Sequence, residues 1–335
     1  KTVKNNQIQF QVKPDSYHFE VKGTKELTHR PVIIGTGPAG LFCGYMLAAH
    51  GYQPILLERG ADVDQRTKDV EAFWENGQLN LSSNVQFGEG GAGTFSDGKL
   101  NTLVKDKSGR NHEVLRIFAE HGAPESITYE SKPHIGTDVL SAVVKKMRKY
   151  IFAHGGEVRF HSQVTDIQTH SDNGQKILRK LKIYDSQKKE TYLLDTDLAV
   201  FAIGHSARDT FSMLYHHGLP MQPKAFAVGV RIEHPQEMIN QDQYGKNYPS
   251  FLPAAPYKLT ANLDNGRGVY TFCMCPGGYV VNASSEEHRL AVNGMSYSRR
   301  DSQNANTAVI VTVSPDDFES DHPLAGVEFQ RKLEE

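Results

Sequence analysis

The 335-residue sequence predicts an α/β protein with a parallel sheet, followed by a second, mainly β domain. Residues 31–60 run in the order of a βαβ unit: a short apolar run, a glycine turn, a helical run and a second apolar run. Residues 197–204 form another apolar run that ends in glycine, as a further buried strand of such a sheet would. After Pro220 strand-like runs dominate, which predicts the change of domain.

The glycine turn has the spacing of a dinucleotide-binding turn and reads Gly35-Thr36-Gly37-Pro38-Ala39-Gly40. In such a turn Gly35 permits the tight bend, Gly37 lets the backbone approach a pyrophosphate, and Gly40 lets the helix pack closely on the strand. The helix N-terminus offers free N–H groups and the positive end of its dipole to the phosphates. Glu58 follows the second apolar run, where a carboxylate accepts hydrogen bonds from both ribose hydroxyls. A βαβ unit that binds nothing is the alternative, and strand, helix and acid together favour a dinucleotide site.

The other elements are predicted from periodicity, in chain order. Residues 61–74 have helical character, and helices are predicted at 112–121 and 138–154. The second of these has Thr137 as a fair N-cap and Gly155 at its end. Strands are predicted at residues 157–161, 163–168, 177–184, 190–194, 225–232, 269–273, 279–283 and 308–313.

A Gly-rich stretch at residues 84–100 carries five glycines between Gly88 and Gly98, too many for a stable helix or strand. A flexible surface loop is one interpretation. Apolar residues interleave with the glycines, however, and this favours an ordered loop packed on a core. In an ordered loop, small residues let backbone N–H groups reach a ligand, so we favour a loop that contacts a ligand.

Composition excludes several classes of function. The net charge of −2 gives no electrostatic case for a nucleic-acid partner or an anionic membrane. There is no apolar run of about 18 residues and no secretory signal in the sequence. Three cysteines without a paired framework fit a reducing compartment, so a cytoplasmic protein is expected. The fifteen histidines are scattered, and no metal site is predicted.

Six stretches carry a resemblance to a known family: residues 30–42, 57–60, 87–100, 202–209, 272–278 and 293–296. With them the chain resembles the bacterial uncharacterised FAD-dependent dehydrogenase family, over most of residues 30–313. That family belongs to the flavoproteins with the glutathione-reductase type of FAD fold. The Gly-rich loop and the Cys-x-Cys-Pro-Gly-Gly stretch at 273–278 are specific to the family, whereas its relatives share the glycine turn.

The resemblance implies a glutathione-reductase-type, Rossmann-like domain that binds FAD non-covalently in extended form. The pyrophosphate would be held by Gly35, Gly37, Pro38, Ala39 and Gly40. Glu58 would hold the adenosine ribose, Arg59 would lie beside the adenine, and Val164 would pair its backbone with the adenine. The flavin side would be lined by Gly90, Gly91 and Gly93, with Gly204 near the FAD at a strand end.

The resemblance also sets the expected domains. Residues 1–29, with an edge strand at 7–12, are interpreted as a linker or the tail of a further region. Residues 30–220 would form the FAD-binding domain and residues 221–335 a β-rich substrate domain. Such flavoproteins carry a late Gly-Asp motif followed by small residues and a helix, and none is readable before Glu335. We therefore expect a chain truncated before its return to the FAD domain, which holds FAD poorly or not at all.

Candidate catalytic side chains are few, because a flavin supplies the hydride chemistry itself. In a strand Cys273 and Cys275 would share a face, turned toward the flavin, as a redox pair, as metal ligands or as plain core residues. His205 follows the strand-end glycine and would either approach FAD or make a local hydrogen bond. Lys99 and Arg231 would hold an anionic substrate or belong to a solvated face.

The sequence thus predicts an FAD-dependent oxidoreductase, a dehydrogenase of a small-molecule substrate, with NAD(P)H as a candidate electron donor. An NAD(P)-binding Rossmann enzyme is one alternative, since Glu58 would serve either cofactor. The Gly-rich loop and Gly204 favour FAD. A flavin-binding structural protein or an accessory protein of RNA modification is the other alternative, which the near-neutral charge does not support. The substrate and the oligomeric state are not readable.

Overall fold

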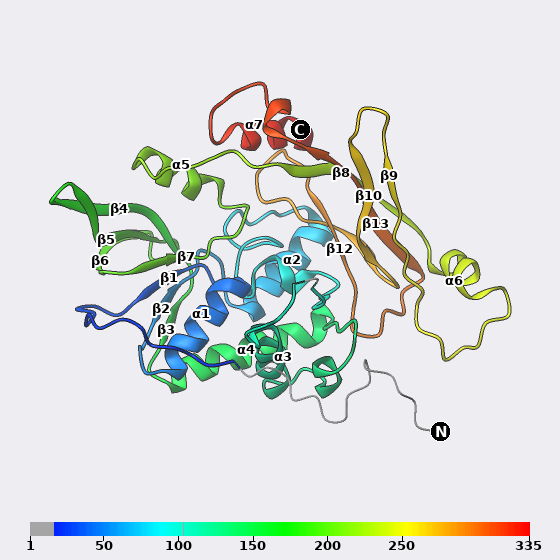
Figure 1. Ribbon diagram of the computed structural model, residues 1–335, viewed down its shortest axis with the longest axis horizontal. Coiled ribbons are helices and arrows are strands. Elements are labelled where there is room, and N and C mark those ends of the chain that lie inside the picture. The colour runs from blue at the N-terminus through cyan, green and yellow to red at the C-terminus, as the bar shows by residue number, and fades with distance from the viewer. Residues whose placement is uncertain (1–16, 103) are drawn as a thin grey trace.

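The computed structural model describes residues 17–102 and 104–335, so the strand predicted at 7–12 lies outside the described residues. Figure 1 shows helices and a small sheet in one part of the molecule and long antiparallel strands in another. The chain finishes with helix α7 (Ala325–Glu334) beside strand β8 (Phe226–Pro235). In residues 17–102 and 104–335 we find no helix with the length and apolar character needed to span a bilayer.

The first sheet is parallel and has the strand order β3-β2-β1-β7. Its strands are β1 (Val32–Ile34), β2 (Ile55–Leu57), β3 (Glu157–Arg159) and β7 (Ala199–Phe201). β1 and β2 are buried on both faces, as continuous apolar runs of a covered parallel sheet should be. The predicted βαβ unit is therefore confirmed, whereas the buried strand predicted at 197–204 is only the short, half-buried β7.

Alternate residues of β1 enter two different cores. Ile33 packs with helices α1 (Pro38–Ala49), α3 (Arg110–Glu120) and α4 (Thr137–Ala153). Val32 and Ile34 face the opposite side, where they pack with a second, antiparallel sheet. That sheet has the order β4-β5-β6, with β4 (Ser162–Asp172), β5 (Gln175–Asp185) and β6 (Glu190–Asp195). The parallel sheet is thus the middle of three layers, and helices cover one face of it.

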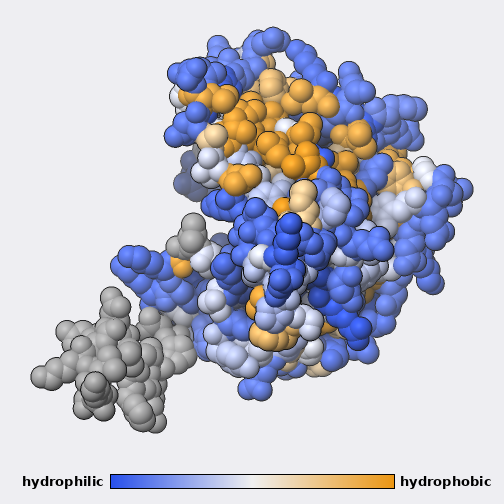
Figure 2. Space-filling view, turned by 90° about the vertical axis from the view of Figure 1, so that its right-hand side faces the viewer, coloured by the Kyte–Doolittle hydropathy of each residue, from blue (hydrophilic) through white to orange (hydrophobic). Residues whose placement is uncertain are grey.

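The later half of the chain forms a longer antiparallel sheet of order β8-β13-β10-β9 and a two-stranded sheet. Besides β8, the longer sheet contains β13 (Asn304–Val313), β10 (Gly268–Cys275) and β9 (Thr260–Asn262). The two-stranded sheet consists of β11 (Tyr279–Asn282) and β12 (Val292–Met295). Figure 2 shows a face of the molecule on which apolar residues gather. Among the exposed large apolar side chains are Val230, Leu259 and Phe272, which belong to this β-rich part or to its connections.

The remaining helices complete the layers. They are α2 (Val63–Asn76), α5 (Arg208–His216) and α6 (Gln236–Tyr244), with 3₁₀ turns η1 (Gly91–Phe95), η2 (Glu125–Thr128) and η3 (Pro315–Asp317). The sequence did not predict α5, α6 or α7, because nine or ten residues carry too short a periodic pattern. α7 contacts both parts of the chain: Phe329 packs on Phe226 of β8, and Glu334 accepts a hydrogen bond from Arg208 of α5.

Candidate functional site

A cavity of about 470 Å³ lies where the parallel strands β1, β2 and β7 end, and it collects most of the predicted cofactor residues. We call it the nucleotide cavity. Loops at the carboxyl ends of parallel strands are where α/β sheets bind ligands. Of the residues predicted from the sequence, it is lined by Gly35, Gly37, Pro38, Ala39, Glu58, Arg59, Gly91, Gly93, Val164, Gly204 and His205. Gly40 and Gly90 are not among the residues that line it.

The glycine turn is built by close backbone packing. A Cβ on Gly40 would stand 1.9 Å from the carbonyl oxygen of Gly35, so only glycine lets α1 begin there. Gly37 is the residue before α1, and the nearest heavy atom to a Cβ built on it would be the Gly91 Cα, 3.8 Å away. Gly40 therefore serves packing, whereas the space in front of Gly37 is free for a ligand. Within the described residues no side chain caps the N-terminus of α1.

Glu58 has a role that the sequence did not reveal. The residue is 4% exposed, and its carboxylate oxygen Oε2 accepts hydrogen bonds from the backbone N–H and the hydroxyl of Thr36, at 2.8 and 2.7 Å. Oε1 accepts from the backbone N–H groups of Gly60 and Gly88, at 2.9 and 3.1 Å. Glu58 therefore ties the glycine turn, the end of β2 and the Gly-rich loop together while it lines the cavity.

The Gly-rich loop is ordered and forms one wall of the nucleotide cavity. The backbone N–H of Gly90 donates to the carbonyl of Thr36 at 2.9 Å, which fastens the loop to the glycine turn. A Cβ on Gly91 would lie 2.8 Å from the Cα of Gly37, and φ at Gly91 is +63°. The contact between the two glycine segments thus requires glycine on the loop side. Val85 and Phe95 anchor the loop in an apolar cluster with Val70 of α2.

Arg66 of α2 holds this loop from behind, and sequence reasoning missed it. The side chain is fully buried, and its guanidinium donates to the main-chain oxygens of Asn84, Val85, Glu89 and Gly91 at 2.6 to 2.9 Å. Burial lowers the pKa of Arg66 to about 10, so the group stays charged at neutral pH. The only sequence signal is its place between Val63 and Val70 on the buried face of α2.

A second buried charge lies beside Arg66. Glu89 is 1% exposed; its Oε2 accepts from the backbone N–H of Val63 at 2.8 Å, and its Oε1 is 3.0 Å from Nε of Arg148. Burial raises the pKa of Glu89 to about 7, against the opposing charge of Arg148. Glu89 is therefore partly protonated at neutral pH. This makes the loop's anchoring sensitive to pH.

The far wall of the cavity carries the remaining predicted residues. Val164 lies on the edge strand β4, which pairs with β5 on one side only. Val164 itself lines the cavity. Gly204 has φ of +70° and follows β7 with open space around its Cα. Next to it, the side chain of His205 reaches solvent, yet desolvation by the surrounding chain and the charge of Arg208 lower its pKa, which favours the neutral imidazole. His205 is thus a neutral donor or acceptor at the cavity wall.

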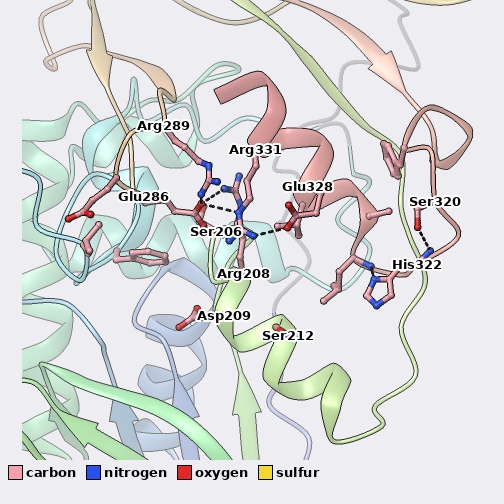
Figure 3. Close-up of a pocket in the computed structure, with 18 of the residues that line it drawn as sticks. Ser206, Arg208, Asp209, Ser212, Glu286, Arg289, Ser320, His322, Glu328 and Arg331 are labelled. Carbon is pink, nitrogen blue, oxygen red and sulfur yellow. Dashed lines mark hydrogen bonds and ion pairs between the residues drawn. The ribbon is translucent and has the colours of Figure 1, made fainter. Parts of the chain in front are cut away.

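A larger cavity of about 810 Å³ adjoins the first and shares Arg59, Phe87 and Ser206 with it. Figure 3 shows Glu286 at its centre, facing Arg289 and Arg331, with Arg208 close by. Ion pairs of 2.6 to 3.2 Å join Glu286 to all three guanidinium groups. Burial alone would raise the pKa of Glu286, but hydrogen bonds from Arg331 and Arg289 and the charge of Arg208 lower it to about 2. Charges here are balanced, so the cavity has no unmatched cation for an anion.

Arg59 connects the two cavities. Its Nη2 donates to Asp209 at 2.9 Å and to the hydroxyl of Thr210 at 3.1 Å. Its guanidinium lies 4.5 Å from the ring centre of Phe87. Arg59 is therefore fixed at the mouth of the nucleotide cavity, where a planar aromatic group can stack on it.

The structure gathers the other candidates elsewhere. Lys99, Arg231, Cys273 and Cys275 form one cluster, together with Asp97, and none of them lines either cavity described above. The prediction that both cysteines share a strand face is wrong in its premise: the register of β10 against β13 shifts between Phe272 and Cys275, and Cys273 has φ of +49°. No group of three or more side chains suited to a metal is found in the described part of the chain.

Comparison with known proteins identifies one family model. Residues 225–335 match the model described as "FAD-dependent protein, C-terminal domain-like". A protein of Clostridium beijerinckii, described only as uncharacterised, is 54% identical over 315 residues, which is 93% of this chain and 57% of that protein. The chain thus spans little more than half the length of this relative.

Solved structures give weaker similarities. The myxobacterial chondrochloren halogenase CndH, an FAD-dependent halogenase, is 12% identical with a TM-score of 0.41, over 91% of this chain and 58% of its own. The glycerol-3-phosphate dehydrogenase from Bacillus halodurans, solved with FAD, is 13% identical with a TM-score of 0.37, over 92% and 54%. THI4 of Thermovibrio ammonificans is 19% identical with a TM-score of 0.38, over 57% and 63%. At such low TM-scores these similarities carry no argument.

Proposed function

We propose that the full-length protein is an FAD-dependent oxidoreductase that holds FAD non-covalently in the nucleotide cavity, and the match of residues 225–335 to a family model of FAD-dependent proteins supports this proposal. The observation that carries this proposal is the contact between the two glycine segments. Gly37 leaves open space before α1, Gly91 packs against Gly37 from the loop side, and this space meets an uncapped helix N-terminus in the described structure. Backbone N–H groups at a helix start suit a pyrophosphate.

Each part of the cavity has a role in this proposal. Gly37, Pro38 and Ala39 would hold the pyrophosphate at the start of α1. Arg59 would stack beside the adenine, and the open edge of β4 at Val164 would pair with it. Glu58 would contribute to the ribose, although four N–H and O–H donors already occupy its carboxylate. The Gly91 and Gly93 side of the cavity would face the flavin.

When bound, FAD supplies the electron-transfer chemistry, and the residues of this chain bind it, orient it and limit the access of water. His205 is the side chain best placed to hydrogen-bond a group beside the cofactor. We further propose the glutathione-reductase subclass of FAD fold and a dehydrogenase activity on a small molecule, with NAD(P)H as electron donor and a cytoplasmic location. The three-layer arrangement of helices, parallel sheet and antiparallel sheet supports the subclass. The Gly-rich wall favours FAD over NAD(P) as the resident cofactor.

The test is a binding panel on the full-length protein. Flavin is released by denaturation and identified, and the cofactor-free protein is then titrated with FAD, FMN, NAD⁺ and ADP. We expect one FAD for each chain, competition by ADP, and no comparable binding of FMN, since FMN lacks the adenosine half. Tight NAD⁺ binding without FAD binding would assign the cavity to the nicotinamide alternative. Folded protein that binds none of the four would contradict a nucleotide site.

A further inference from the structure

The cluster of cysteines and cations described above lies on a distorted piece of strand. Two residues of β10, Cys273 and Met274, stand opposite the single residue Thr307 of β13, so β10 carries a bulge. In a regular strand the Cα atoms of residues i and i+2 lie about 6.6 Å apart, which is near the upper limit of the Cα separation that a disulfide can bridge. The bulge breaks this regular spacing, and the thiol of Cys275 donates to the main-chain oxygen of Cys273 at 3.2 Å, so the Cys275 side chain turns back toward Cys273. The left-handed backbone of Cys273 is strained, as functional positions often are.

The two thiols differ in exposure and are linked to each other. Cys275 is fully buried and Cys273 is half-buried. Contact with the Cys275 thiol, with Lys99 and Arg231 nearby, lowers the pKa of Cys273, whereas the same contact and burial raise the pKa of Cys275. Cys273 is thus the more exposed thiol and the one that ionises more readily, and Cys275 is the buried one. This asymmetry is typical of an attacking and a resolving cysteine.

Cations and donors converge on the pair from three other segments. Arg231 of β8 donates to the carbonyl of Cys273 at 3.4 Å and lies 4.0 Å from the sulfur of Cys275. Nζ of Lys99 donates to the carbonyl of Met274 and pairs with Asp97 at 2.6 Å. The nearby anion Asp97 of the Gly-rich loop is itself bound by Arg300 at 2.9 Å. The charge balance around Cys273 therefore favours a thiolate.

Asn306 of β13 completes the cluster. It is fully buried, its Oδ1 accepts from Arg231, and its Nδ2 has no partner among the described residues. A Cβ on Gly294 would stand 2.3 Å from Oδ1 of Asn306 and 2.8 Å from the sulfur of Cys275, so both lie around one small space. An unpaired buried N–H donor is costly unless something else accepts from it. A thiolate or a bound sulfur group would serve that purpose.

We propose that Cys273 and Cys275 form a reversible dithiol–disulfide pair that exchanges two electrons with a small-molecule disulfide. The Cys273 thiolate attacks one sulfur of the disulfide, forms a mixed disulfide and releases the first thiolate. The Cys275 thiol gives its proton to that thiolate, and its sulfur attacks Cys273. The new S–S bond expels the second thiolate, which takes up the proton that Cys273 had lost to solvent. Two protein thiols are oxidised and one small disulfide is reduced to two thiols.

The Gly-rich loop joins this pair to the nucleotide cavity. Gly91 and Gly93 of the loop line the cavity, and Asp97 and Lys99 a few residues later belong to the cysteine cluster. A change of charge at Cys273 thus acts on the segment that walls the cavity. The dithiol proposal itself does not depend on FAD.

The test uses full-length protein with Cys43 replaced by serine, so that the only cysteines of residues 1–335 are the two in question. Glutathione disulfide is added to the folded protein, and free thiols and intact mass are followed. We expect both thiols to disappear together with the loss of two hydrogen atoms, and dithiothreitol to restore them. With Cys275→Ser the glutathione adduct should accumulate on Cys273, and with Cys273→Ser the oxidation should be lost. Thiols that stay reduced until the protein unfolds, or an adduct that never resolves, would overturn the proposal.

Cation variants give a second readout. Labelling of Cys273 by iodoacetamide is measured against pH in the Cys43→Ser background. We expect Lys99→Met and Arg231→Met each to slow labelling at pH 7 by about tenfold, because the thiolate fraction falls. Lys105→Met, a lysine outside the cluster, is the matched control and should leave the profile unchanged. Identical profiles in all three variants would show that Lys99 and Arg231 do not set the reactivity of Cys273.

Discussion

The guanidinium of Arg66 donates through Nη1 to the main-chain oxygen of Gly91 at 2.9 Å, and so joins a buried helix residue to the wall of the nucleotide cavity. The same side chain binds three further carbonyls of the loop. Gly91 in turn touches the backbone of Gly37. The shape of the cavity therefore depends on a residue that does not line it.

Replacing Arg66 by methionine should loosen the Gly-rich loop. Four buried carbonyl groups would lose their donor, so we expect the free energy of unfolding to fall by about 3 kcal/mol or more. Urea unfolding measures this, and hydrogen exchange at 84–91 should rise. Lys68→Met, on the exposed side of the same helix, is the control and should change stability by less than about 0.5 kcal/mol. An Arg66 variant as stable as this control would refute the anchoring role.

Replacing Glu58 by alanine should have two separable effects. The apo protein loses an acceptor for four buried donors, and we expect about 2–4 kcal/mol lower stability by thermal or urea unfolding. FAD affinity, measured well below the melting temperature, should fall by about 1.5–3 kcal/mol through a lost charge-assisted hydrogen bond. The exposed Glu71→Ala is the control. Unchanged affinity with lowered stability would restrict Glu58 to the structural role.

Gly40→Ala tests the packing of α1 on the parallel sheet. Its Cβ would meet backbone, not a flexible side chain, at 1.9 Å, so neither partner can move away cheaply. We expect a loss of soluble folded protein or a destabilisation of about 3 kcal/mol. Gly268→Ala, where a Cβ has open space, is the matched control for thermal melting. Equal melting temperatures for the two variants would mean that the turn is less tightly packed than described.

Glu89 makes stability depend on pH. Its pKa is raised from 4.5 to about 7 in the folded state, so between these values the folded protein binds more protons than the unfolded chain. Stability contributed by this group is therefore complete below about pH 4.5 and is lost as pH rises to 7, by at most about 1.4 kcal/mol per pH unit. The free energy of unfolding is measured in urea from pH 5 to 8. In Glu89→Gln it should no longer fall with pH through this group, whereas the exposed control Glu130→Gln should keep the fall. A slope unchanged by Glu89→Gln would assign it to other groups.

The sequence predicted the parts of the fold that depend on local pattern. The strands at Val32 and Ile55 and the turn at Gly35 are specified by short apolar runs and by glycines at fixed spacing. These also predicted most of the nucleotide cavity, because the residues of one βα turn stay together in space. The short helices α5 and α7 were missed, since each is fixed by contacts such as Arg208 with Glu334 across 126 positions of sequence.

The parts that were missed depend on tertiary contacts. An arginine in an amphipathic helix usually faces solvent, so the position of Arg66 between Val63 and Val70 does not by itself predict that its side chain is buried. The alternation of side chains in strand β10 fails at Cys273 because the strand bulges there. The sequence does not reveal this bulge, since neither Cys273 nor Met274 is a glycine or a proline. The gathering of Lys99, Arg231 and the two cysteines likewise requires three segments that are far apart in the sequence.

FAD affinity of Gly37→Ala in the full-length protein tests the central claim most directly. A Cβ there meets no atom closer than 3.8 Å, so the variant should fold and melt like Gly268→Ala. The methyl group would nevertheless enter the open space beside the α1 N-terminus, where we propose that the pyrophosphate binds. We predict FAD binding at least about tenfold weaker than in Gly268→Ala, which corresponds to about 1.4 kcal/mol. Wild-type FAD affinity in a folded Gly37→Ala protein would contradict the assignment of FAD to this cavity.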